Sequence, residues 1–389
     1  MKNFNYHQNT EIVFGTGRVA EAGAIVSKYG KRCLMVTTPD APLLPLFERL
    51  KKILQDAGVA VAHFKGVVPN PTTETSAAGS RMAIEHKADV ILGVGGGSSM
   101  DAAKAIAVEA SHEGSAWDYL FYKQPAPDPS KVLPVVAIST TSGTGSQVTQ
   151  VSVITNTAER DKSALYNPLL FPKVAIVDPE LMLTLPASVT APTGFDVFCH
   201  AFESMINPGT GAYVELLAKE AIGLVVENLP KVLENGSDLE AREKMAWADT
   251  LAGLCIASAG VTLPHGMGMA VGGMYPHVAH GESLAILYPA CTRFTASYAV
   301  EQYAFMARAL NPALASVPDS EAAVSACDEV SKFLKSIGLY KGLKDVNMPE
   351  DEIVALARQS MVLPDYQGNP RVATEAEMIE LVREAYYQS

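Results

Sequence analysis

The sequence has few cysteines, few charged side chains and no run of basic residues. Its five cysteines are an odd number, lie far apart and form no Cys-x-x-Cys pair. They indicate neither a disulfide framework nor a zinc ribbon, and a reducing cytoplasm is the expected location. The net charge of −12 would repel phosphate groups, which argues against nucleic acids and anionic membrane surfaces. We therefore expect a small-molecule partner, with no nucleic acid and no membrane.

Two further features are missing. Residues 1–15 lack the apolar core of a signal peptide, so we expect no secretory leader. Residues 251–273 lack Asp, Glu, Lys and Arg and could be mistaken for a membrane span, but they contain Pro264, His265 and several glycines. We interpret this stretch as a buried helix.

The composition is typical of a globular chain with an ample core. Its 389 residues, 48% apolar and 19% charged, predict two or three domains. The first half alternates continuous apolar runs with helix-like segments, which indicates a parallel sheet covered on both faces. The expected strands are 32–38, 88–97, 132–140 and 174–179, and the expected helices are 45–58 and 72–87.

The second half has a different pattern. Apolar positions recur at helical spacing, and no segment reads as a strand. The expected helices are 212–236, 238–260, 298–310, 320–338 and 373–389. Proline and threonine near residue 185 mark the change without a long linker. We therefore predict an α/β nucleotide-binding domain at 1–185 and a helical metal-binding domain at 186–389.

Four side chains have the chemistry of a metal site. Asp196 and His200 stand four residues apart in a helical stretch, which places them on one face. His265 and His280 add two imidazoles. Three imidazoles and one carboxylate suit Fe(II) or Zn(II) rather than Mg or Ca, and a set without thiolate favours an open catalytic site. The alternative for any single histidine is a core side chain bonded to the backbone.

Residues 93–104, GVGGGSSMDAAK, follow an expected strand and open a helix. Glycines let backbone N–H groups approach a pyrophosphate at the helix N-terminus, although a turn without a ligand is the alternative. Residues 15–20 match the dinucleotide pattern more closely. The run TEIVF before them is short and does not predict a strand of a parallel sheet, so we interpret residues 15–20 as a structural turn.

A second loop, STTSGTGSQVT at 139–149, also follows an expected strand. Its hydroxyl and N–H donors could contact a phosphate, a ribose or a nicotinamide amide, although an ordinary Ser/Thr turn is the alternative. Two such loops at strand ends are where open α/β sheets bind ligands. Gln147 in this segment and Gln150 directly after it are polar amides, which are compatible with a small polar or anionic substrate.

Together these segments resemble the iron-containing, or group III, alcohol dehydrogenases. The motifs that carry the resemblance are FGTGR, PNPTTET (69–75), GGGSSMDAAKA (95–105), STTSGTGSQVT (139–149), DPELMLTLP (178–186), TGFDVFCHAFES (193–204), HGESLAILYP (280–289) and NPR (369–371). The resemblance implies a Rossmann-like N-terminal domain and an all-α C-terminal domain, the architecture also found in dehydroquinate synthase. It further implies a nucleotide cofactor and one divalent metal held by Asp196, His200, His265 and His280.

This chain departs from the family at three places. Many members have a further histidine near the nicotinamide where this chain has Met269. The spacing from His265 to His280 is one residue longer than in the family, and His277 lies between them. His277 is thus a candidate proton relay or a plain surface histidine. Many NAD-using members have Asp after the strand's Val-Thr, where this chain has Thr38; Asp40 could reach the ribose instead.

We therefore predict an NAD-linked, metal-dependent enzyme that interconverts a small primary alcohol or diol and its aldehyde, acting as an aldehyde reductase. NADP and Zn(II) are the alternatives to NAD and Fe(II), and we expect a homo-oligomer, a dimer or larger. Alternative functions are reduction of a small anionic aldehyde, dehydroquinate synthase-like or glycerol dehydrogenase-like chemistry, and a nucleotide-binding regulatory module. The residues predicted to bind the nucleotide are Thr38, Asp40, Gly96, Gly97, Ser98, Asp101, Thr140, Thr141, Ser142, Thr144, Lys162 and Leu181.

Overall fold

The computed structural model describes residues 3–123 and 126–388, and the chain divides into two compact units. One unit is His7–Leu185 and the other is Pro186–Ser389 with the N-terminal residues up to Tyr6. The first unit combines strands and helices, whereas the described residues from 186 onward form helices and no strand. The predicted fold class, an α/β unit followed by an all-α unit, is confirmed.

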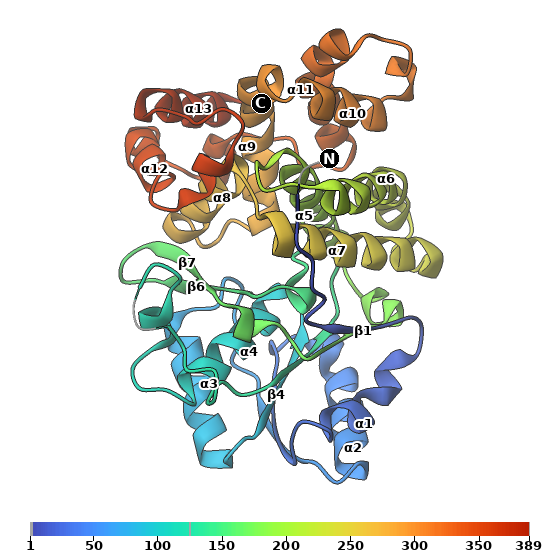
Figure 1. Cartoon of the computed structure of the whole chain (residues 1–389), viewed down its shortest axis with the longest axis vertical. Helices are drawn as coiled ribbons and strands as arrows, with labels where there is room; N and C mark the ends of the chain where they lie inside the picture. The colour runs from blue at the N-terminus through green and yellow to red at the C-terminus, as the bar shows by residue number, and fades with distance from the viewer. Residues whose placement is uncertain (1–2, 124–125, 389) are drawn as a thin grey trace. The chain divides into compact units, whose positions relative to one another are not determined.

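A parallel sheet of six strands, in the order β1-β8-β5-β4-β2-β3, forms the centre of the α/β unit. Figure 1 labels β1 and β4 of this sheet. Every neighbouring pair is parallel. The chain leaves β2 for β3 on one side and returns to β4 on the other, so its direction through the sheet reverses between β2 and β4. The strands are β1 (Glu11–Phe14), β2 (Arg32–Val36), β3 (Ala60–Phe64), β4 (Val90–Gly95), β5 (Val135–Ser139) and β8 (Val174–Val177).

Helices cover both faces of this sheet because its strands are apolar on both sides. Cys33 and Met35 of β2 pack in one core cluster with α1 (Ala22–Val26) and α2 (Leu44–Asp56). Their neighbours Leu34 and Val36 pack in another cluster. The helices of that second face are α3 (Thr73–His86) and α4 (Gly97–Glu109). Alternate side chains thus serve opposite faces, as expected for a doubly covered parallel sheet.

Some strands were not predicted from the sequence. TEIVF does contain a strand, β1, which pairs in parallel with β8, so the interpretation of that run was wrong. It was missed because β1 has four residues and one fully buried side chain. β3 and the antiparallel hairpin of β6 (Val151–Asn156) and β7 (Asp161–Tyr166) were missed as well.

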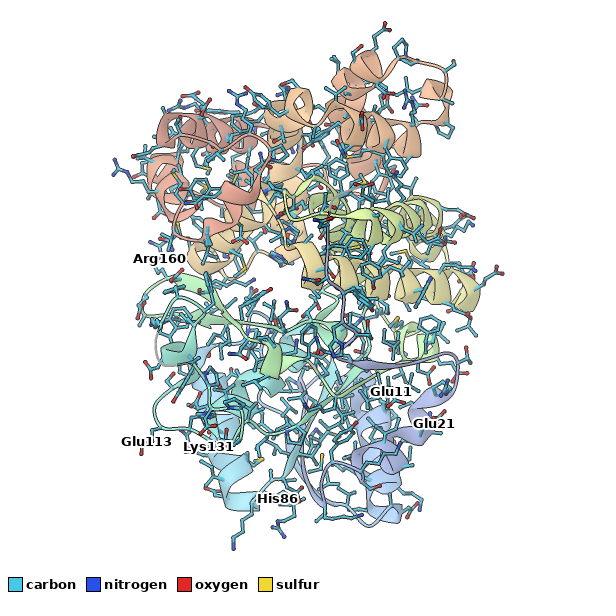
Figure 2. The ribbon with its side chains drawn as sticks, in the orientation of Figure 1. Glu11, Glu21, His86, Glu113, Lys131 and Arg160 are labelled. Atoms are coloured by element: carbon cyan, nitrogen blue, oxygen red, sulfur yellow. The ribbon has the colours of Figure 1, made fainter. Side chains whose placement is uncertain are left out.

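Charged side chains of this unit such as Glu11, Glu113 and Lys131 are exposed on its outside (Figure 2).

The helical unit has two apolar cores. One is formed mainly by α5, α6, α7, α9, α10 and α11, and the other mainly by α8, α9, α12 and α13. The helices are α5 (Ala187–Ile206), α6 (Ala212–Glu234), α7 (Leu239–Ala259), α8 (Leu263–Met274), α9 (His280–Thr295), α10 (Val300–Leu310), α11 (Asp319–Ser336), α12 (Ile353–Gln359) and α13 (Glu375–Tyr387). α9 contributes to both cores and therefore joins them.

The stretch 251–273, expected to be one buried helix, is divided between α7 and α8. The two helices are bent by 101° at the break. Gly260 there has φ 75, a positive backbone angle that glycine adopts without strain and that ends α7, and Pro264 stands in the first turn of α8. Among the described residues no single helix is long and apolar enough to cross a membrane, and only this bent pair reaches that length and composition when taken together.

Candidate active site

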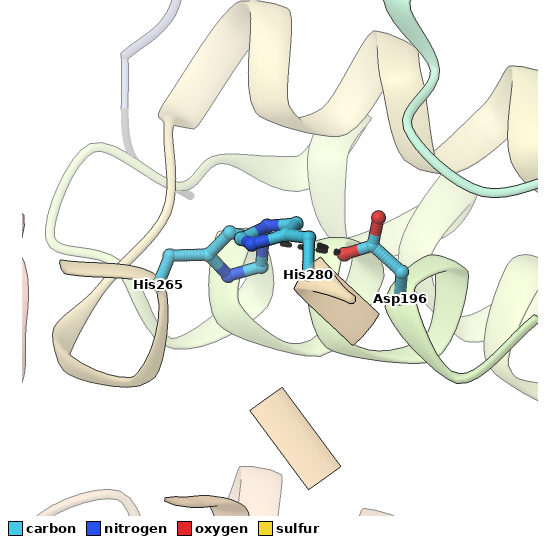
Figure 3. A group of neighbouring side chains, drawn as sticks. All are labelled: Asp196, His265 and His280. Carbon is cyan, nitrogen blue, oxygen red and sulfur yellow. Dashed lines mark ion pairs between the residues drawn. The ribbon is translucent and has the colours of Figure 1, made fainter. Parts of the chain in front are cut away.

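Asp196, His265 and His280 come together in the helical unit (Figure 3). One ligand atom from each lies within 4.8 Å of the others. The Asp196 Oδ1 atom is 3.5 Å from His265 Nε2 and 3.9 Å from His280 Nε2. The first residue comes from α5, the second from the first turn of α8 and the third from the start of α9. Three helices thus direct one carboxylate and two imidazoles to one point.

His200 borders this group. It follows Asp196 by one helical turn on α5, and its Nε2 atom is 3.6 Å from Asp196 Oδ1. Its ring stacks on that of His265, with the ring centroids 4.6 Å apart. The structure therefore brings all four predicted metal-site residues into one cluster, with His200 beside the closest three.

The cluster is buried and electrically coupled. Side-chain exposure is 3% for Asp196 and 6% for His265, and rises to 21% for His280. Burial alone would raise the pKa of Asp196, but the charges of His200 and His280 outweigh it and lower this pKa to about 2. Burial would lower the pKa of His265, but Glu203 and Asp196 outweigh it and raise this pKa to about 10. The carboxylate of Asp196 is thus held in its charged form and attracts positive charge, which either a protonated imidazole or a bound cation in place of that proton can supply.

A glycine allows His280 to reach this cluster. A Cβ atom on Gly281 would lie 1.9 Å from the backbone O of Pro192. The first turn of α9 therefore runs directly against α5, at a distance that no other residue permits. This contact explains why a glycine follows His280.

The two glycine-rich loops meet in the α/β unit. They follow the neighbouring strands β4 and β5, and Thr140 N donates to Gly95 O at 2.9 Å. A Cβ atom on Gly97 would lie 2.5 Å from Thr144 Cγ2, and one on Gly96 would lie 3.1 Å from Thr141 Cγ2. Gly97 is also the first residue of α4, so N–H groups at a helix N-terminus lie where the loops touch.

A buried lysine of α4 holds the end of the second loop, 139–149, by hydrogen bonds. Lys104 of α4 is 0% exposed, and its Nζ donates to the backbone O atoms of Ser146, Thr149 and Val151 at 2.7 to 3.0 Å. Ser146 Oγ donates to Asp101 Oδ1 at 2.6 Å, and Val153 N donates to Asp101 Oδ2 at 3.2 Å. Burial lowers the pKa of Lys104 to about 8. Asp101 and Lys104 thus support the loop.

Comparison with known proteins identifies the family. The model of the iron-containing alcohol dehydrogenases matches residues 9–179, and that of the C-terminal part of the same family matches residues 190–386. The chain belongs to the iron-containing alcohol dehydrogenase family. It is accordingly an oxidoreductase of the alcohol and aldehyde class.

Known proteins match this iron-containing alcohol dehydrogenase along nearly its whole length. It is 34% identical to the NAD-dependent methanol dehydrogenase of Bacillus methanolicus, over 96% of this chain and 97% of that one. An archaeal halo-thermophilic alcohol dehydrogenase from a Red Sea brine pool has a similar structure, with 33% identity and a TM-score of 0.92 over 99% and 100% of the two chains. A sulfoacetaldehyde reductase from Bifidobacterium kashiwanohense, in complex with NAD+, has 30% identity and a TM-score of 0.85 over 100% of both chains.

Other predicted site residues of this alcohol dehydrogenase lie as follows. His277 is exposed in the segment before α9, and its Nε2 is 2.9 Å from Val346 O, outside the group of Asp196, His265 and His280. Met269 is buried in α8, one turn after His265. No imidazole therefore occupies that turn.

The remaining predicted nucleotide residues belong to the α/β unit. Thr38 Oγ1 donates to Asp40 Oδ2 at 2.7 Å just after β2. Lys162 Nζ donates to Asn70 Oδ1 at 2.9 Å, and Ser142 Oγ lies 3.2 Å from Met182 Sδ. Ser98 stands in the first turn of α4, and Leu181 in the short turn after β8.

The two glutamines linked to the substrate in the sequence are buried in this alcohol dehydrogenase. Gln147 is 0% exposed and Gln150 is 4% exposed. Gln150 Nε2 donates to the hydroxyl of Tyr166 at 2.8 Å. That bond ties Gln150 to β7 within the α/β unit.

Sequence reasoning missed Glu203. This residue is 0% exposed on α5, and its Oε1 accepts a hydrogen bond from His265 Nδ1 at 2.7 Å. It follows Asp196 by seven residues and His200 by three, so helical periodicity places all three on one face. That periodicity is the signal that could have revealed it.

Proposed function

We propose that this chain is a metal-dependent, NAD(P)-linked enzyme that interconverts a small primary alcohol or diol and its aldehyde, working as an aldehyde reductase. The cluster of Asp196, His200, His265 and His280 is the observation that carries the proposal. NAD is the proposed nucleotide and Fe(II) the proposed metal. A cytoplasmic location and a homodimer complete the proposal.

The donor atoms of the cluster fit a divalent ion. Asp196 Oδ1 and His265 Nε2 are buried polar atoms without a hydrogen-bond partner, which is costly unless something else binds them. Ligands about 2.1 Å from a tetrahedral ion lie about 3.4 Å from one another. The distances of 3.5, 3.6 and 3.9 Å from Asp196 Oδ1 to the three Nε2 atoms are close to that value.

The residues of this chain have distinct roles in the proposal. When bound, the metal supplies a Lewis acid for the substrate oxygen and the nucleotide supplies hydride chemistry. Asp196, His200 and His265 hold the ion from the buried side. His280 is the most exposed of the four measured side chains and leaves room for a substrate.

The loops of the α/β unit are the proposed nucleotide site. Gly96, Gly97 and Ser98 bring N–H groups of the α4 N-terminus to the pyrophosphate, and Thr140, Thr141, Ser142 and Thr144 add donors from the neighbouring loop. These loops and the segment after β2 lie at the carboxyl ends of strands next to the reversal between β2 and β4, where open α/β sheets bind nucleotides. Lys162 and Leu181 complete the proposed set of nucleotide-binding residues.

Asp40 provides a test of nucleotide choice. If its exposed carboxylate binds the adenine ribose and repels a 2′-phosphate, Asp40→Ala should narrow the preference for NADH over NADPH by about tenfold, or about 1.4 kcal/mol. The measurement is kcat/KM with each nucleotide. Asp56→Ala, which removes another exposed carboxylate of this unit, is the matched control. Equal efficiency with both nucleotides, unmoved by Asp40→Ala, would show that Asp40 does not read the ribose.

Substrate and direction are tested on the purified protein. Protein supplied with Fe(II) or Zn(II) should oxidise NADH with short aldehydes, and a smaller rate is expected for alcohol oxidation at neutral pH. Charged aldehydes belong in the same screen because a structural neighbour is a sulfoacetaldehyde reductase. A higher kcat/KM with an anionic aldehyde than with neutral ones would select the second candidate function. Absence of metal-dependent nucleotide oxidation with every aldehyde and diol would contradict the proposal.

A further inference from the structure

Glu203 of α5 is a buried carboxylate, and both of its oxygen atoms accept hydrogen bonds from the α8 side. Its Oε1 accepts from His265 Nδ1 at 2.7 Å. Its Oε2 accepts from the backbone N of Thr262 at 2.8 Å and from Thr262 Oγ1 at 3.2 Å. A carboxylate with no exposed surface is costly unless donors surround it, and here three donors do so.

These contacts hold the start of α8 and one imidazole together. Thr262 is the residue directly before α8, and its own side chain makes no capping bond to the helix. His265 is the third residue of α8. The same carboxylate therefore fixes both the backbone from which His265 extends and the rotation of its ring.

We propose that Glu203 is a positioning residue for the metal site: it keeps the proton of His265 on Nδ1 and directs Nε2 toward Asp196. This inference rests on the metal site of the proposed function. A proton held on Nδ1 leaves the Nε2 lone pair for a metal, and carboxylates that orient a ligating imidazole change metal affinity by about 10- to 100-fold when removed.

The test is a titration of metal-stripped protein with Co(II), followed by visible absorption. In Glu203→Gln one side-chain atom becomes an N–H₂ donor, so the side chain cannot accept from both His265 Nδ1 and Thr262 N. We expect Co(II) binding to weaken by about 10- to 100-fold and the cobalt spectrum to change. NADH affinity should stay the same. Glu329→Gln on α11 is the matched control, because Glu329 is also buried in this unit but bonds Lys332, and it should titrate like the original protein.

A purely structural role is separated by two more variants. Thr262→Val removes only the hydroxyl contact to Glu203, so it should lower thermal stability while Co(II) affinity and spectrum remain. Glu203→Asp keeps the charge but shortens the side chain, and it serves if Glu203→Gln does not fold. We expect weaker Co(II) binding from it as well.

The outcomes separate this inference from the proposed function. Original Co(II) affinity and spectrum in Glu203→Gln or Glu203→Asp, with Co(II) binding lost in His265→Ala, would overturn the role of Glu203 alone. The same is true if Thr262→Val reproduces the full effect on Co(II). Undiminished Co(II) binding in His265→Ala would instead refute the metal site itself.

Discussion

His265→Ala should yield a folded protein with one metal ion fewer per chain and no turnover. His265 lies between Asp196 and Glu203, so its removal deletes a donor atom and also leaves a buried carboxylate without one of its partners. Metal affinity should fall by more than the factor of about 10 to 100 that is expected when only a residue that orients a ligand is removed. Elemental analysis and circular dichroism measure metal content and folding.

The neighbouring histidines supply the controls for this experiment. His280→Ala should also lose metal, whereas His277→Ala should keep it, because His277 bonds Val346 O outside the cluster. Unchanged metal in both His265→Ala and His280→Ala would refute the assignment. Retention in His280→Ala together with loss in His277→Ala would make His277 the ligand.

Gly97→Val should weaken NADH binding by roughly 3 kcal/mol, or about a hundredfold in Kd, while metal content stays the same. Even a Cβ atom at this position would lie 2.5 Å from Thr144 Cγ2. The side chain would therefore push apart the two loops and obstruct the approach to the α4 N-terminus. Fluorescence titration with NADH measures the effect.

The control for Gly97 is another helical glycine. A Cβ atom on Gly223 of α6 would meet nothing within 4 Å, so Gly223→Ala should leave NADH affinity unchanged. Gly97→Ala should show an intermediate effect because it creates the clash without the bulk. An NADH titration of Gly97→Val that matches the original protein would exclude this loop from the nucleotide site.

The fold could be predicted where hydrophobic pattern and burial agree. β4 and β5 are fully buried along their length and read as continuous apolar runs. β3 has a pattern of mostly half-buried side chains and contains His63, so neither alternation nor a continuous run identifies it. β6 and β7 mix apolar and polar side chains (VSVITN and DKSALY), so no continuous apolar run marks this hairpin in the sequence.

The candidate site shows the same limit. Asp196 and His200 could be paired from their spacing because they share one helix, whereas His265 and His280 were added for the chemistry of their imidazoles and then supported by the resemblance to a family. Glu203 stands in the same helical motif as Asp196 and His200. Its proposed role depends on its contact with His265 of α8, which is 62 residues further along the chain. Contacts between helices depend on how the helices pack, and the spacing of residues along one helix does not predict that packing.

The four proposed metal ligands come from three helices of a single unit, which would have a thermodynamic consequence. An ion that binds the folded unit but not the unfolded chain stabilises it by RT ln(1 + [M]/Kd), about 2.7 kcal/mol at a hundredfold excess over Kd. α5, α8 and α9 would share this stabilisation, and the sheet unit would gain none directly. The concentration of free metal would thus set the stability of the helical unit against unfolding and proteolysis, in addition to the activity of the enzyme.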